Sequence, residues 1–279
     1  MKLWYDFWQL LPFEMLHWKF MCNALLAVIL MAPLFGLCST MIVSGRMSFF
    51  SDALGHSAFT GIAIGCLCSF SDPTWVSVIF AVAFAALFSF VRSKSNQAAD
   101  TIIGVFSSTA VALGIFIATL GGDSFTKFNR YLIGDILSIT PGQIGMLLLV
   151  LVGVAVFWVF FSNKLTLSSV HPQLASSRGI HVPLLQGLFT AEIAVVVTLT
   201  ISCVGLLILN SLLVLPAAAA RNISKNIRQY HIFSIIFALI AGIAGLILSY
   251  LLGASSGAAI SLILAMVYAL CFALRKVRG

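Results

Sequence analysis

The chain has 279 residues, of which 61% are hydrophobic and only 8% are charged, and its mean hydropathy is +1.12. A water-soluble domain has about 25% charged residues, so this composition excludes an ordinary soluble globular protein and predicts an integral membrane protein. The formal net charge of +7 comes from basic residues between the apolar stretches, which indicates membrane topology rather than nucleic-acid binding.

Nine apolar stretches follow one another along the chain. A stretch of about 18 or more apolar residues can cross a ~30 Å hydrocarbon core as a helix, so we predict an all-α, polytopic membrane protein. The seventh stretch is short and is interrupted by Gly205, Asn210 and Pro216, so eight spans are an alternative to nine. The stretches are residues 20–43, 52–70, 74–91, 101–120, 143–161, 184–204, 205–220, 231–251 and 254–273.

The basic residues are divided unequally between the two sides of these spans. With the amino terminus outside, eleven Lys and Arg side chains lie on the cytoplasmic side and four on the other, which is the positive-inside distribution. Residues 1–19 contain three tryptophans and no small-residue cleavage site, so we predict an interfacial helix rather than a cleaved signal. Residues 20–273 then form a single transmembrane domain, and residues 274–279 a cytoplasmic tail.

Asp52 and His56 lie four residues apart at the start of the second stretch. On a helix, both side chains project from one face. Ionisable groups at the edge of a membrane span mark a path for an ion or a substrate, and carboxylate and imidazole are ligands that suit zinc, manganese and ferrous iron. The pair therefore predicts a path for a divalent metal. The alternative is that Asp52 only caps the helix.

Two stretches carry small residues at a spacing of four. Small residues at this spacing let two membrane helices approach closely, so these two helices could pack together. The residues are Ser57, Gly61 and Gly65 in the second stretch, and Gly104, Ser108 and Ala112 in the fourth. The six cysteines all lie within apolar stretches and show no metal-site or disulfide spacing, so they are interpreted as packing residues.

Two connections between spans are long enough to carry function. Residues 121–142 predict an external loop with a short helix near 132–138, either solvated or used for docking. In the connection 163–182, Pro172 suits a first helical position and Gly179 a C-terminal cap, which predicts a two-turn helix on the cytoplasmic face that a soluble partner could contact.

Glu192 lies about ten residues from the cytoplasmic end of its span, near mid-membrane at ~1.5 Å rise per residue. Such a group must pair, stay protonated or face a wet cavity, so Glu192 is a second pathway candidate. The chain contains no Gly-x-x-x-x-Gly-Lys-Ser/Thr phosphate loop, so it cannot hydrolyse ATP by that motif.

Three separated blocks together resemble the membrane permeases of zinc, manganese and iron ABC importers, over about residues 14–273. Residues 131–140, which contain the second block, favour the zinc-type members. The blocks are Arg46-Met47-Ser48 with Ser51-Asp52-Ala53-Leu54-Gly55-His56, then Tyr131-Leu132-Ile133-Gly134-Asp135-Ile136-Leu137, then residues 204–221.

The resemblance implies a type II (vitamin B12-importer-like) permease that forms a homodimer in a bacterial inner membrane. Two cytoplasmic ATP-binding subunits would drive it, and an extracytoplasmic metal-binding protein would supply it. Asp52 and His56 match the family's gate residues, but a further acid found before the aspartate in some members has no match, because Arg46 and Ser48 stand there. The coupling helix maps to about 171–181, with Pro172, Ala175, Arg178 and Gly179.

One Asp52 and one His56 are too few ligands to hold a metal ion, but two copies across a two-fold axis supply two carboxylates and two imidazoles, a set acceptable to zinc and tolerable to manganese. We therefore predict a transport subunit, not an enzyme. It would move a divalent transition metal, Zn²⁺ rather than Mn²⁺ or Fe²⁺, into the cytoplasm at the homodimer interface, with no permanently bound cofactor.

Other functions remain open on the sequence alone. An ion-coupled secondary carrier typically shows an internal repeat with paired broken helices, which we do not find, although Glu192 would suit one. An ABC permease for a metal chelate would share the architecture without needing the Asp52–His56 pair. A structural or assembly protein would leave Asp52 and Glu192 unexplained.

Overall fold

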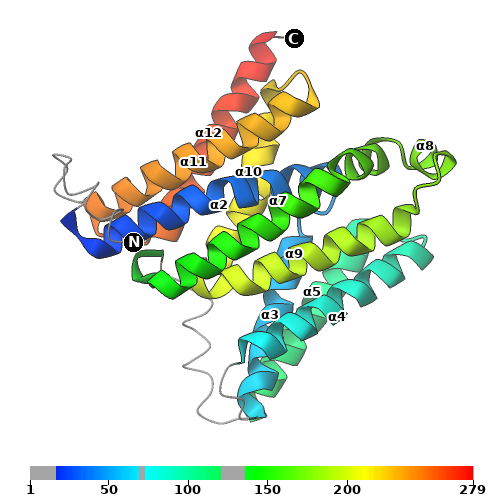
Figure 1. Ribbon diagram of the computed structural model, residues 1–279, viewed down its shortest axis with the longest axis horizontal. Coiled ribbons are helices and arrows are strands. Elements are labelled where there is room, and N and C mark those ends of the chain that lie inside the picture. Colours follow the sequence, from blue (N-terminus) through cyan, green and yellow to red (C-terminus); the bar gives the residue numbers. More distant parts are fainter. Residues whose placement is uncertain (1–16, 69–72, 121–135, 279) are drawn as a thin grey trace. The chain divides into compact units, whose positions relative to one another are not determined.

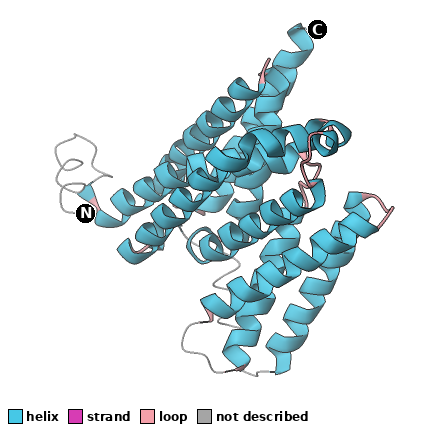
Figure 2. Cartoon of the chain, turned by 45° about the vertical axis from the view of Figure 1, so that its right-hand side comes forward, coloured by secondary structure: helices cyan, strands magenta, loops and turns pink. Residues whose placement is uncertain are grey.

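The structure is a computed structural model that describes residues 17–68, 73–120 and 136–278. These residues form ten α-helices and one short 3-10 helix, and no strand occurs among them (Figure 2). The predicted all-α fold is confirmed. The elements are α2 (Lys19–Ser44), α3 (Phe50–Leu67), α4 (Thr74–Lys94), α5 (Ala99–Leu120), η2 (Ile136–Ser138), α7 (Pro141–Val170), α8 (Pro172–Ser177), α9 (Val182–Val204), α10 (Leu206–Ile223), α11 (Ile227–Leu252) and α12 (Ser256–Arg278).

Each of the nine predicted apolar stretches corresponds to a helix. Seven of them, α2, α4, α5, α7, α9, α11 and α12, are long and apolar enough to cross a membrane, which confirms a multi-pass protein. The other two, α3 and α10, have 18 residues each. Of the three predicted interruptions near α10, only Gly205 interrupts the helix, with a φ of +83° between the end of α9 and the start of α10. Asn210 and Pro216 lie inside the continuous helix α10.

The helices form two compact units that alternate along the chain. Unit 1 comprises Met1–Thr40, Gly134–Gly153 and Cys203–Gly279, and unit 2 comprises Met41–Ile133 and Val154–Ser202. In unit 1, α10 packs on both α11 and α12, and in unit 2, α3 packs on both α4 and α5 (Figure 1). All predicted site residues belong to unit 2. The single domain predicted over 20–273 stays a prediction.

Some predictions fall outside the described residues. The interfacial helix predicted for residues 1–19 lies almost entirely there, as does most of the predicted external loop 121–142. Of the short helix predicted near 132–138, the structure describes only the 3-10 turn Ile136–Ser138.

Within unit 1, serine side chains form hydrogen bonds to backbone groups of neighbouring helices. The Ser39 hydroxyl of α2 accepts a hydrogen bond from the backbone N–H of Ala217 in α10 at 3.1 Å. The Ser234 hydroxyl of α11 donates to the carbonyl of Gly36 in α2 at 2.8 Å. These bonds satisfy polar groups in a part of the chain where water cannot.

In unit 2, α3 and α4 approach backbone to backbone at Gly61. A Cβ atom at Gly61 would lie 2.5 Å from the Cα of Ser77, so only glycine fits. The Ser77 hydroxyl then donates to the carbonyl of Ala58 in α3 at 2.6 Å. The small-residue spacing predicted for α3 is therefore used against α4.

We expect Gly61→Val to lower the melting temperature of the purified protein in detergent. The added side chain must push α4 away, and overpacking of this kind costs about 1–3 kcal/mol. Gly104→Val is the matched control, because a Cβ atom there meets nothing within 4 Å. Equal melting temperatures for the two variants would contradict the close approach of α3 and α4.

The predicted packing of α3 on α5 is present, but the residues predicted to make it on α5 are wrong. Gly104, Ser108 and Ala112 are exposed. The contact instead uses Gly114, where a Cβ atom would lie 2.8 Å from the hydroxyl oxygen of Thr60 in α3. Helix α5 carries a second stripe of small residues at the same spacing, and this stripe is the buried one: Ala110, Gly114 and Ala118.

Candidate functional site

A tight turn between α2 and α3 positions the acidic residue of the predicted pair. The chain turns at Arg46, and Phe50 then begins α3. The Phe50 ring is fully buried and stacks on Phe88 of α4 with 4.3 Å between ring centroids. Because Phe50 fixes the first turn of α3, Asp52 stands in that turn at a defined place.

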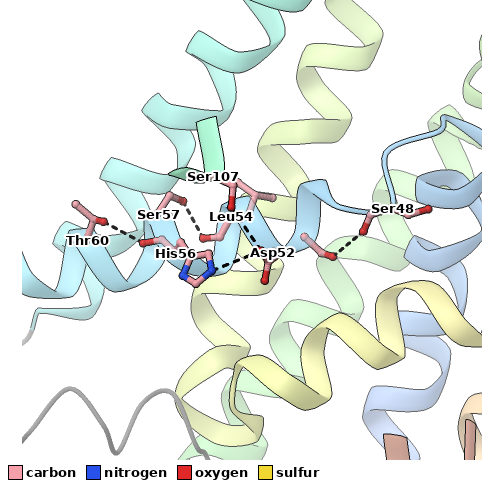
Figure 3. Close-up of polar contacts among 8 residues, drawn as sticks. Ser48, Asp52, Leu54, His56, Ser57, Thr60 and Ser107 are labelled. Atoms are coloured by element: carbon pink, nitrogen blue, oxygen red, sulfur yellow. Dashed lines mark hydrogen bonds and ion pairs between the residues drawn. The ribbon is translucent and has the colours of Figure 1, made fainter. Parts of the chain in front are cut away.

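Asp52 and His56 lie on one face of α3, as the sequence predicts (Figure 3). The Oδ2 atom of Asp52 is 3.5 Å from Nε2 of His56. The Ser107 hydroxyl of α5 donates a long hydrogen bond of 3.5 Å to the same oxygen. The N-cap of α3 is Phe49, so Asp52 lies in the first turn of the helix and not at the N-cap position.

Both side chains of the pair are partly exposed. The Asp52 side chain is 40% exposed and the His56 side chain 24%. Within the described residues, no group of three or more His, Cys, Asp or Glu side chains could hold a metal ion. At this place the described residues of one copy therefore supply one carboxylate and one imidazole.

Ser107 is the residue of this site that the sequence analysis missed. It is a polar side chain inside an apolar helix, which is a usable signal, but the spacing of small residues directed attention to its exposed neighbour Ser108. Its hydroxyl touches the carboxylate of Asp52 and so links α5 to the pair.

Glu192 lies inside α9, in unit 2, as predicted. Both carboxylate oxygens are buried and have no hydrogen-bond partner among the described residues. The hydroxyl of Thr198, further along the same helix, is also buried and has no hydrogen-bond partner in the described part of the chain. The structure does not gather Glu192 with Asp52 and His56 into a three-ligand site.

The short helix predicted between the fifth and sixth spans is present as α8, from Pro172 to Ser177, shorter than the predicted 171–181. Pro172 occupies its first position, and Gly179 follows its end with a φ of +77°. The N–H of Ile180 bonds the carbonyl of Ala175 at 3.1 Å, and the N–H of Gly179 bonds that of Ser176 at 3.0 Å. This pair of bonds is the Schellman motif, which needs the left-handed residue that glycine supplies.

The remaining predicted residues of this segment have different environments. Ala175 is fully buried, whereas Arg178, which ends α8, is exposed. One side of α8 therefore packs on unit 2 while its end presents a positive charge. Such a helix, exposed between two spans, can serve as a contact for a second protein.

Multiple apolar helices, a carboxylate–imidazole pair at the start of one of them and an exposed connecting helix define a polytopic membrane transport protein. The chain belongs to the ABC 3 transport family, whose model matches residues 17–275. It is therefore a membrane permease subunit of an ABC transporter. The prediction of a transport subunit rather than an enzyme, with ATP hydrolysed by a separate subunit, is confirmed by this membership.

Two relatives of the chain are named as membrane proteins of metal transport systems. The chain is 28% identical to the high-affinity zinc uptake system membrane protein ZnuB of Buchnera aphidicola subsp. Baizongia pistaciae, over 77% of this chain and 83% of that protein. It is 24% identical to the manganese transport system membrane protein MntC of Listeria monocytogenes, over 82% and 81%.

A solved structure, PsaBC from Streptococcus pneumoniae in complex with Fab, has the same fold. The TM-score is 0.79 at 24% sequence identity, and the match covers 98% of this chain and 95% of that one. This likeness confirms the predicted ABC permease fold.

Proposed function

We propose that this permease imports a divalent transition metal, with Zn²⁺ as the preferred cargo and Mn²⁺ or Fe²⁺ as alternatives, along a path at the two-fold axis of a homodimer. The observation that carries the proposal is the Asp52–His56 pair, held on one helix face with 3.5 Å between Oδ2 and Nε2 and partly exposed. A second copy would double the pair to two carboxylates and two imidazoles.

This ligand set explains both binding and release. Four nitrogen and oxygen ligands suit tetrahedral zinc, and the same set is tolerable to manganese, in keeping with relatives named for zinc and for manganese transport. Because each chain contributes only half of the set, a small movement of one copy against the other dismantles the site. Transport requires such transient binding, since an ion that binds too tightly cannot leave.

The proposed partners follow from the family and from α8. A cytoplasmic ATP-binding subunit would contact α8 around Arg178, and an extracytoplasmic metal-binding protein would deliver the ion to the opposite side. The proposed orientation has α8 and the carboxyl terminus in the cytoplasm of a bacterial cell and the amino terminus outside, and the excess of basic residues on one side supports it. In that orientation α3 begins near the cytoplasmic side.

Glu192 is the second element of the proposed pathway. A carboxyl group whose two oxygens are buried without a partner is costly inside a membrane protein, and such groups are retained mainly for function. A passing cation or a proton would satisfy it. A chelate permease would need neither this group nor exposed metal ligands, so these residues favour a bare ion as the cargo.

Reconstitution tests the proposal. We expect proteoliposomes that contain the permease with its ATP-binding subunits and metal-binding protein to take up zinc only when ATP is supplied, and manganese more slowly. The permease alone is expected to move neither ion. Zinc uptake by the permease alone, driven by a proton or sodium gradient, would instead support the secondary carrier.

A further inference from the structure

Unit 2 contains a cavity of about 220 Å³ where the carboxyl-terminal ends of α2, α4 and α7 meet the start of α9. All these helix ends lie at the same side of their spans, so the cavity opens at one membrane surface. Its volume is far above the ~10–15 Å³ that one water needs, so it can admit a larger group. Its polar lining comprises Ser44, Arg46, Arg92, Ser168, Ser169 and Gln186.

The charge of this lining is unbalanced. Two guanidinium groups line the cavity, and no Asp or Glu is among the described residues that line it. Arg92 donates one hydrogen bond, from Nη2 to the carbonyl of Gly45 at 3.2 Å, which uses one of its five N–H donors. Arg46 makes no ion pair with any described residue. The cavity therefore offers several positively charged donors for which the described residues supply no anionic acceptor.

The backbone holds Arg46 in an unusual conformation. Its φ is +54°, the only positive value at a described residue other than glycine. The N–H of Met47 bonds the carbonyl of Ile42 at 2.9 Å, and the N–H of Arg46 bonds that of Val43 at 3.3 Å, so Arg46 takes the place in a Schellman motif that glycine usually occupies. An arginine there costs backbone strain, which points to a use for its side chain.

The donors at this cavity suit a phosphate oxyanion. A guanidinium binds phosphate through two parallel N–H donors, and it remains charged at any physiological pH. The hydroxyls of Ser168 and Ser169 donate to the carbonyls of Leu165 and Thr166 at 2.9 Å each. The two arginines, Gln186 and Ser44 are the donors left for a ligand. Phosphate groups of lipids lie at the level where spanning helices end.

We propose that the cavity lined by Arg46 and Arg92 binds a phosphate group, either that of an anionic phospholipid headgroup or inorganic phosphate. The bound group would place its negative charge between the two guanidinium groups and offset part of their charge. It also bridges two segments that transport would use, because Arg46 lies in the turn before α3 and Pro172, the first residue of α8, lines the same cavity. This site goes beyond the proposed function, and its test measures binding alone.

The test compares ligands on the purified full-length chain. Native mass spectrometry would record bound phosphatidylglycerol, phosphatidylcholine and inorganic phosphate in separate titrations. We expect the wild-type chain to bind phosphatidylglycerol or inorganic phosphate at least about tenfold more tightly than phosphatidylcholine, which shares the phosphate but has no net charge. Preference for the lipid over inorganic phosphate assigns the headgroup as the ligand, and the reverse assigns the free ion.

Variants decide whether the cavity is the site. Arg46→Asn and Arg92→Gln are expected to weaken that binding about tenfold. Asparagine tolerates the left-handed backbone, so Arg46→Asn preserves the turn even if Arg92→Gln disturbs its bond to Gly45. Lys94→Gln is the control, because it removes a charge from the exposed end of the same helix α4 and does not line the cavity. Equal losses in all three variants, or no wild-type preference for either anion, would overturn the proposal.

Discussion

Replacing His56 with alanine is expected to abolish metal uptake while leaving a folded, membrane-inserted protein. In a homodimer the change removes both imidazoles and leaves two carboxylates, which is too few ligands to hold zinc. Loss of groups that only support metal ligands costs 10–100-fold, so loss of two ligands is expected to lower uptake by at least about 100-fold. Asp52→Ala is expected to have an equal effect, because it removes the other half of the set.

The fold is expected to survive both changes. The two side chains are partly exposed. The hydrogen bond that the Thr60 hydroxyl donates to the carbonyl of His56 at 3.0 Å does not depend on the His56 side chain. Radiolabelled zinc and manganese uptake would be measured in cells that lack the native chain, and co-purification would report assembly with the ATP-binding subunit.

Asp100→Asn is the matched control for these variants. Asp100 is also an acid in the first turn of a helix of unit 2, but it is exposed and belongs to α5. Uptake by this variant should equal that of the wild type. Full uptake by either Asp52→Ala or His56→Ala would remove the pair from the pathway.

Local chemistry explains which parts of the fold the sequence could predict. The apolar stretches end where polar residues begin, so the helices were predictable, and Pro172 and Gly179 were enough to place α8 because each acts on its own backbone. Asn210 and Pro216 gave a wrong indication of a break. Helix α10 continues through them, since membrane helices tolerate proline where other groups satisfy the freed backbone.

Long-range contacts explain what the sequence could not predict. Helix α5 has two stripes of small residues with the same spacing, and nothing local indicates that Gly114 rather than Gly104 faces α3. Arg46 and Arg92 both belong to the basic residues from which the topology is predicted, and nothing in the sequence pairs one with the other. The fold brings both side chains to the lining of one cavity, and a single sequence does not show this proximity.

The second large effect is expected at the end of α8, where Gly179→Val should separate ATP hydrolysis from metal uptake. A β-branched residue at a φ of +77° raises the conformational energy by at least about 1–2 kcal/mol. We expect the backbone to relieve this strain by breaking the two hydrogen bonds to the carbonyls of Ala175 and Ser176 that end the helix. The exposed end of α8 then moves relative to the ATP-binding subunit. Metal transported per ATP hydrolysed is expected to fall at least about tenfold, with hydrolysis itself continuing.

The chain supplies a matched control for this strain. Gly253 ends α11 in the same left-handed conformation, with a φ of +62°, but it lies in unit 1 and outside α8. Gly253→Val should therefore cost similar stability and leave the ratio of metal transported to ATP hydrolysed unchanged. Arg178→Glu, which reverses the exposed charge without straining the backbone, is expected to lower the ratio as Gly179→Val does. If neither α8 variant changes the ratio, the segment is an ordinary connection and the ATP-binding subunit contacts the permease elsewhere.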